Sequence, residues 1–208
     1  MPQPEPRSRT RATIAKEKGL EPLAQILWMQ KTKKSLEEEA QVFVSEEKEV
    51  KSVQEALAGA QDILAEMISD EADYRIHIRN LTVKNGSISS VAKKTEETSV
   101  YEMYYDYEEP IAKIAGHRVL ALNRGEKEKI LTVKINAPED EILVWLKRQI
   151  IINDNKNTKP VLEAVAEDSY KRLIAPAIER EIRNDLTEKA EDGAMKVFGK
   201  NLEQLLMH

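Results

Sequence analysis

The sequence contains no cysteine, and only 5% of its 208 residues are aromatic. Without cysteine the chain cannot form disulfides, Cys-ligated zinc sites or a thiol nucleophile. The scarcity of aromatic residues also disfavours a β-sandwich, whose strands are rich in aromatic and β-branched side chains. What the sequence has instead is 41% hydrophobic and 33% charged residues. This balance is typical of long amphipathic helices with aliphatic cores and densely charged outer faces.

Long apolar runs are missing as well. No stretch approaches the roughly 20 apolar residues that a membrane-spanning helix requires, and the first eleven residues, MPQPEPRSRTR, lack the apolar segment of a secretory signal. These absences predict a cytoplasmic chain that makes no contact with a membrane.

The formal net charge of −5 argues against a chain that binds nucleic acid over its whole surface. The charge is uneven, however: residues 1–19 carry a net +3, residues 36–73 a net −10 and residues 113–134 a net +4. Any contact with phosphates is therefore expected in the first and third segments. In the first segment the candidates are Arg7, Arg9 and Arg11.

The first half of the chain has the periodicity of helices. Ser35 with Glu38, and Ser52 with Glu55, have the spacing of capping boxes that open helices. After the second box, apolar residues recur every three or four positions from 53 to 81, with a break expected near residues 69–70 and an end at the Asn-Gly pair 85–86.

The middle of the chain is predicted to be mixed. Residues 88–92 and 130–135 are β-branched and short, which favours a two-stranded antiparallel pairing. Between them we expect a short helix that begins after Ser99 and carries several tyrosines, and a second helix from His117 to Asn123 that ends at Gly125.

The last third of the chain is again helical in pattern. A helix is expected over 139–152, a loop over 153–158 and a helix from Pro160 to about Ile174, after which Pro176 opens or kinks the final helix. In this final helix apolar residues recur every four positions, so the stripe winds around the helix and predicts contacts with more than one neighbour. Ala190 and Ala194 are expected to let a neighbouring element approach closely. The apolar end of the sequence, 202–207, suggests a piece of a longer protein.

Together these patterns predict a mainly α fold, a multi-helix assembly with long amphipathic helices and room for one small two-stranded antiparallel sheet. Residues 1–8, with three prolines, are expected to be extended or disordered. Residues 9–208 are expected to form one helical region, or two subdomains at 9–152 and 158–207.

Two segments of the middle region could contact nucleic acid. The segment Tyr101–Pro110 gathers four of the six tyrosines, which could stack on bases or pack in the core; its acidic residues would repel phosphates, which favours packing. In the segment 116–128, His117, Arg118 and Arg124 could form an anion site at a helix, or the two arginines could pair with acids of the tyrosine segment. No residue is predicted to be catalytic, metal-binding or cofactor-binding.

Four stretches resemble the Tex family of bacterial transcription accessory proteins: RTRATIAKEKGLEPLA (9–24), EALAGAQDILAE (55–66), YYDYEEPIAKIAGHRVLALNRGEKE (104–128) and SYKRLIAPAIEREIR (169–183). Ala115-Gly116 departs from the family, where Pro-Ser is common. The resemblance implies a helical region followed, in the full-length protein, by a ribonuclease-H-like domain, helix-hairpin-helix elements and an OB-type RNA-binding domain.

By this resemblance the chain is expected to be a non-catalytic scaffold region of a protein that binds RNA or DNA and acts in transcription. Nucleic acid would be bound through the full-length protein, with the transcription machinery as a further expected partner and no small-molecule substrate. The alternative is a protein–protein interaction module that never touches nucleic acid.

Overall fold

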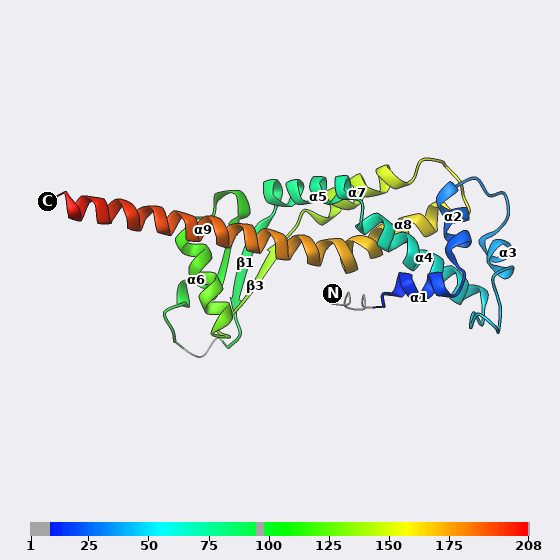
Figure 1. Cartoon of the computed structure of the whole chain (residues 1–208), viewed down its shortest axis with the longest axis horizontal. Coiled ribbons are helices and arrows are strands. Elements are labelled where there is room, and N and C mark those ends of the chain that lie inside the picture. Colours follow the sequence, from blue (N-terminus) through cyan, green and yellow to red (C-terminus); the bar gives the residue numbers. More distant parts are fainter. Residues whose placement is uncertain (1–8, 95–97, 208) are drawn as a thin grey trace, which may run out of the picture. The chain divides into compact units, whose positions relative to one another are not determined.

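The computed structural model describes residues 9–94 and 98–207, which are mainly α-helical with one small antiparallel sheet (Figure 1). The predicted fold class is confirmed. The described residues form two compact units, each built from separate stretches of sequence. Unit 1 comprises residues 9–75 and 140–175, and unit 2 comprises 76–94, 98–139 and 176–207. The predicted start, 1–8, lies outside the described residues, and the division at 152–158 stays a prediction.

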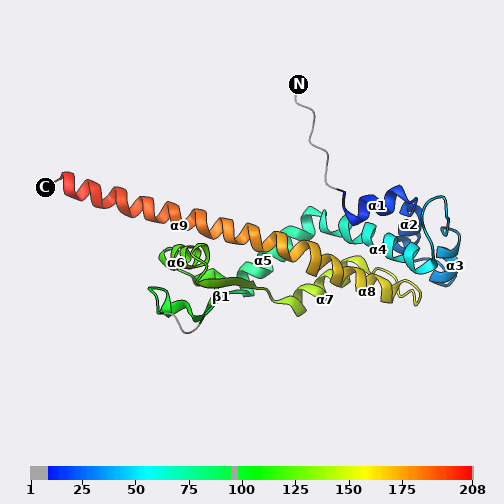
Figure 2. The same ribbon diagram turned by 90° about the horizontal axis from the view of Figure 1, so that it is seen from below.

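Unit 1 is assembled around helix α4 (Val53–Ser69), which contacts α1 (Arg11–Glu17), α2 (Glu21–Met29), α3 (Leu36–Gln41) and α8 (Lys159–Asp168) (Figure 2). The predicted caps are present: the Ser52 hydroxyl accepts the Glu55 amide at 3.1 Å, and the Ser35 hydroxyl accepts the Glu38 amide at 3.2 Å. Helix α7 (Glu139–Ile150) and the first turn of α5 (Ala72–Asn85) complete this part of the chain. The expected break falls between α4 and α5, as predicted.

Gln30 ties the end of α2 to the loop that follows α7. Its side chain is buried, its backbone is left-handed at φ 56°, and its amide nitrogen donates to the Ile150 carbonyl at 2.7 Å. Its side-chain oxygen accepts the amide of Ile152 at 3.0 Å, and its own carbonyl accepts the side chains of Asn153 and Asn155 at 3.3 Å each. One buried amide thus satisfies backbone groups of a loop more than 120 positions away.

A π-helical turn over Ser169–Ile174 joins α8 to the long helix α9 (Ala175–Leu206). The amide of Ala175 donates to the carbonyl of Tyr170, five residues earlier. Pro176 has no amide hydrogen, so an ordinary α-helical bond cannot form there, and the wider turn accommodates its ring without ending the helix. The predicted disturbance at Pro176 is therefore a local change of helix type just before the proline.

Unit 2 contains a three-stranded antiparallel sheet in the order β2-β1-β3, formed by β1 (Ser87–Ala92), β2 (Asp106–Pro110) and β3 (Leu131–Asn136). The predicted pairing of 88–92 with 130–135 is confirmed, with Ile88 opposite Ile135. The helix expected after Ser99 is wrong: the structure has only a 3-10 turn, Glu102–Tyr104, followed by β2. The backbone of 106–110 pairs with β1, a long-range partner that helical periodicity does not reveal.

Helix α6 (Gly116–Lys127) packs on β3. The expectation that this helix ends at Gly125 is wrong, because it continues to Lys127. Gly125 lies inside the helix, where a Cβ would lie 2.5 Å from Leu131 Cδ1, so glycine permits the close approach of helix and strand. At the other end of α6, a Cβ on Gly116 would lie 3.2 Å from the Cα of Ala190 in α9. Ala190 thus permits the close approach predicted for it.

The apolar stripe of α9 is buried only along its first part. Ile178, Ile182 and Ala190 are buried, whereas every described residue from 191 onward is exposed, Ala194 included. The exposed part carries large apolar side chains: Met195, Val197, Phe198, Leu202, Leu205, Leu206 and Met207. Among the described residues, no helix is both long and apolar enough to span a bilayer.

Replacing Gln30 with alanine is expected to lower the free energy of unfolding by about 2 kcal/mol, because one buried carbonyl and the loop amides lose their partner. Urea unfolding followed by circular dichroism measures the change. Gln25→Ala, at an exposed position of the same helix, is the matched control and is expected to have no effect. Equal effects of the two substitutions would contradict this account of Gln30.

Gly125→Ala is expected to lower the free energy of unfolding by about 1–3 kcal/mol, because the added methyl group collides with Leu131. Gly193→Ala, where nothing lies within 4 Å of the new Cβ, is expected to raise it by about 0.5–1 kcal/mol through helix propensity alone. Thermal and urea melts of both variants test the pair. A stabilised Gly125→Ala protein would show that the helix–strand contact is not tight.

Candidate nucleic-acid interface

The predicted contact residues fall in both units. Arg7 lies outside the described residues. Arg9 and Arg11 belong to unit 1, at the start of α1, whereas His117, Arg118 and Arg124 lie along α6 in unit 2. The second group therefore shares one helix, with His117 and Arg118 in its first turn and Arg124 in its last.

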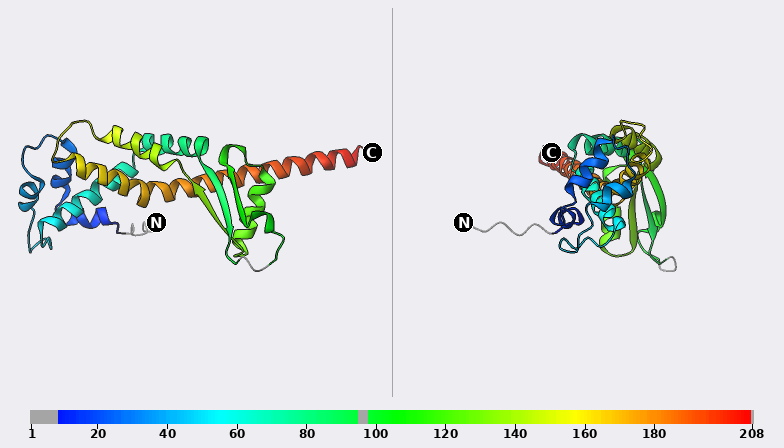
Figure 3. Two further views of the ribbon diagram at one scale, coloured as in Figure 1. Left: turned by 180° about the vertical axis from the view of Figure 1, so that it is seen from behind. Right: turned by 90° about the vertical axis from the view of Figure 1, so that its right-hand side faces the viewer.

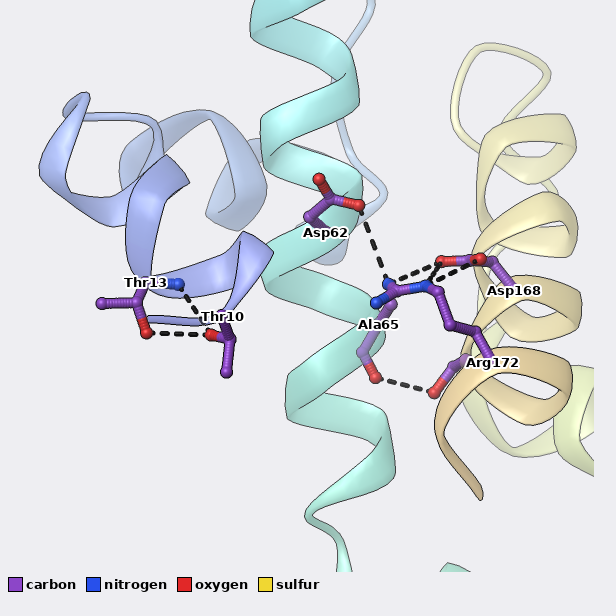
Figure 4. Close-up of polar contacts among 7 residues, drawn as sticks. Thr10, Thr13, Asp62, Ala65, Asp168 and Arg172 are labelled. Atoms are coloured by element: carbon purple, nitrogen blue, oxygen red, sulfur yellow. Dashed lines mark hydrogen bonds and ion pairs between the residues drawn. The ribbon is translucent and has the colours of Figure 1, made fainter. Parts of the chain in front are cut away.

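The start of α1 is held by Thr10, whose hydroxyl accepts the Thr13 amide at 3.1 Å (Figure 4). Arg9 forms an exposed ion pair with Glu17. Arg11 borders a groove of about 840 Å³ between α1 and α4, which is lined by further basic residues, Lys18 and Lys51, and by acids that include Glu55 and Asp62. Acidic neighbours thus offset the positive charge of this helix, which weakens its attraction for phosphates.

Asp62 lines that groove, and its carboxylate points towards Arg172 (Figure 4). Arg172 approaches it at 3.7 Å and is held by Asp168 at 2.9 Å, within the π-helical join. Burial raises the pKa of the Asp62 carboxyl, although the guanidinium groups of Arg172 and Arg11 act in the opposite direction. Nearby, the buried Ser169 hydroxyl donates to the Ala65 carbonyl at 2.7 Å. These contacts fasten the π-helical turn to α4.

Arg118 is engaged by the tyrosine segment. Its guanidinium donates to the Tyr107 hydroxyl at 3.2 Å, lies 5.8 Å from the centre of the Tyr107 ring and approaches Glu109 at 3.9 Å. The Tyr107 hydroxyl in turn donates to Glu109. The pKa of Tyr107 is raised, mainly by burial and secondly by this hydrogen bond. Tyr104 is buried and packs edge-on against Tyr107, with 5.2 Å between ring centres. This geometry matches the packing alternative for Arg118 and for the tyrosines.

Arg124 differs from Arg118 because it is exposed and forms no ion pair with a described residue. The neighbouring acids have other partners. Glu126 pairs with Arg183 of α9 at 2.8 Å, and Glu128 accepts a hydrogen bond from Tyr101. The pKa of Tyr101 is raised, mainly by burial and secondly by this hydrogen bond. His117 is also exposed. The two exposed candidates therefore lie at opposite ends of α6, and the C-terminal end presents Arg124 with no ion pair to a described residue.

Sequence reasoning missed two basic residues near this end of α6, Lys93 and Lys94. They directly follow β1, and the predicted pairing of 88–92 with 130–135 could have placed them beside residues 129 and 130. Among the described residues no group of three or more His, Asp or Glu side chains is arranged to hold a metal ion.

Arg118→Ala is expected to lower the melting temperature by about 2 °C, because the Tyr107 hydroxyl and ring lose their cation. Arg124→Ala removes the same charge from the same helix but breaks no ion pair with a described residue, so its melting temperature should fall less. Differential scanning calorimetry compares the two variants with the parent chain. A larger loss for Arg124→Ala would contradict the roles given to these arginines.

The sequence of residues 31–198 matches the family described as Tex central region-like. The chain is 52% identical over 202 residues to the uncharacterized protein YdcI of Bacillus subtilis. This alignment covers 96% of this chain and 28% of the relative. It is 35% identical over 213 residues to human S1 RNA-binding domain-containing protein 1. This alignment covers 95% of this chain and 21% of the relative.

A third relative, the transcriptional accessory protein Tex of Neisseria gonorrhoeae, is 28% identical over 212 residues, with 97% of this chain and 27% of the relative covered. The chain spans about a quarter of the length of these curated relatives. Because the family match covers most of its residues, the chain belongs to the Tex central region-like family.

Proposed function

We propose that this chain is a non-catalytic helical scaffold region of a Tex-like transcription accessory protein, which acts in the cytoplasm and binds RNA or DNA. The observation that carries the proposal is the family match over residues 31–198. Relatives whose names include a transcriptional accessory role and S1 RNA-binding domains support it. The transcription machinery is the second proposed partner, and no small-molecule substrate is proposed.

The scaffold role is supported by the way polar contacts are used. Gln30 satisfies a distant loop, Arg172 fastens the π-helical turn, and Arg183 joins α9 to α6 through Asn123 at 3.0 Å and Glu126. Each of these side chains holds one element to another. Such a framework suits a region that orients other parts of a longer protein.

Direct contact with nucleic acid is proposed as a secondary role of this chain, and it is weak. The overall charge of −5 opposes binding, whereas the exposed basic end of α6 favours it locally. Of the predicted residues, Arg124 and His117 are the exposed candidates in unit 2, whereas Arg118 is half-buried against Tyr107.

The alternative role, a protein–protein interaction module, is favoured by one observation. The second part of α9 exposes seven large apolar side chains between Met195 and Met207, including Phe198 at 67% exposure. Apolar surface of this kind commonly marks a site that another protein surface covers.

A salt titration with this 208-residue chain separates the two roles. Fluorescence anisotropy with labelled single-stranded RNA and duplex DNA is expected to give dissociation constants of about 1–100 µM near 100 mM salt, weakening steeply as salt rises. A peptide nucleic acid of the same base sequence has no phosphates, serves as the control and should not bind. Absence of binding to RNA and DNA at about 20 mM salt would refute direct contact and leave the interaction module.

A further inference from the structure

Five basic residues from separate parts of the sequence meet at one end of the sheet in unit 2. Lys93 and Lys94 follow β1, and the amide of Lys93 donates to the carbonyl of Ile130 at 2.9 Å, directly before β3. The remaining three, Arg124, Lys127 and Lys129, belong to the end of α6 and the turn after it. Figure 3 shows these strand ends and the adjoining end of α6 at the same end of the sheet.

The charges of this basic edge, defined as Lys93, Lys94, Arg124, Lys127 and Lys129, face solvent. All five residues are exposed, and none forms an ion pair with another described residue. Two acids lie in the same stretch of chain: Glu126 pairs with Arg183 of α9, whereas Glu128 accepts a hydrogen bond from Tyr101 and keeps its negative charge beside the five cations. Glu96 and Glu97 follow in the sequence and lie outside the described residues.

The backbone under the basic edge is held in place. The amide of Lys129 donates to the Glu126 carbonyl at 3.0 Å, with a left-handed φ of 62°, and the amide of Ile130 donates to the Gly125 carbonyl at 2.9 Å. Gly125 itself lies tightly against Leu131. The five cations are therefore attached to one well-packed corner of unit 2.

Helix stability explains only some of these cations. Positive charges near the end of α6 interact favourably with the helix dipole, which accounts for Arg124, Lys127 and Lys129. Lys93 and Lys94 follow a strand, so the dipole gives no reason for them. Two additional cations placed beside three others raise the electrostatic energy of the free protein, a cost that a polyanionic ligand would remove.

We infer that the basic edge binds the phosphodiester backbone of nucleic acid without reading its bases. This inference rests on the proposed nucleic-acid role and gives it a location. Charged groups that contact phosphates carry no sequence information. Base stacking would need an exposed ring. Tyr101 is only 4% exposed, and Tyr105, whose carbonyl accepts the Ala92 amide, is half-buried with its hydroxyl hydrogen-bonded to Ser99. The edge thus suits RNA and DNA of any sequence.

The test is a triple charge reversal in the full chain, Lys93→Glu, Lys94→Glu and Lys129→Glu. The matched control reverses three exposed lysines of unit 1, Lys31→Glu, Lys33→Glu and Lys34→Glu, so both variants carry the same net charge. Affinity for single-stranded RNA and for duplex DNA is measured by anisotropy between about 20 and 200 mM salt. Polyglutamate and phosphatidylserine vesicles serve as the other polyanions.

The basic-edge variant is expected to bind both nucleic acids at least tenfold more weakly, with the slope of log affinity against log salt reduced by about 2–3, since each lost phosphate contact removes about 0.7–0.9. The control variant should lose less than about threefold at 100 mM salt, where distant charges are screened. Thermal melts establish that both variants fold. Lys93→Gln with Lys94→Gln is the milder second variant, expected to lower the slope by about 1–2.

The remaining outcomes overturn the inference in distinguishable ways. Equal losses in the two triple variants would show a general charge effect, and unchanged binding in the basic-edge variant would place the contact elsewhere; in both cases the proposed nucleic-acid role survives. Failure of the parent chain to bind either nucleic acid removes that role and the basic edge together. Tighter binding of polyglutamate or vesicles would assign the edge to another kind of partner.

Discussion

Each unit depends on glycines against which a neighbouring element packs so closely that a side chain would not fit. In unit 1, a Cβ on Gly59 of α4 would lie 2.4 Å from Leu20 Cδ1 and 3.3 Å from Ala15 Cβ. In unit 2, Gly125 serves the same purpose between α6 and β3, and Gly116 with Ala190 does so between α6 and α9. A chain with few aromatic residues has few large side chains to fill wide gaps, so close approach is how its core reaches normal density.

The fold could be predicted where its causes are local. Helix caps such as those at Ser35 and Ser52 depend on residues three positions apart, and the apolar repeat of α4 depends on neighbours within two turns. The strand β2 was missed because its hydrogen bonds join residues about 20 positions apart, for example Ser89 and Glu108. Gly125 was misread for the same reason, since a glycine that ends a helix and one that admits a strand look alike in sequence.

The candidate site was harder to predict than the fold. The sequence left two alternatives for Arg118 and Arg124. The structure separates these arginines, because Tyr107 engages Arg118 whereas Arg124 forms no ion pair with a described residue. Whether an arginine forms an ion pair depends on which cations the neighbouring carboxylates contact. Glu126 is satisfied by Arg183, 57 positions away, and no spacing rule connects such a pair. Lys93 and Lys94 become candidates only because the register of β1 with β3 places them beside the turn that precedes β3.

The distribution of charge bears on how an acidic chain could contribute to nucleic-acid binding. At physiological salt a charge is felt over roughly 8 Å, so a phosphate at the basic edge responds to the five local cations and little to acids farther away than that. The same screening keeps the contact weak and sensitive to salt, because few phosphates are neutralised. A weak, sequence-independent contact on a rigid corner cannot select a target. It can hold a strand close while other domains of a longer protein bind it, since a second, linked contact raises the effective concentration of the first.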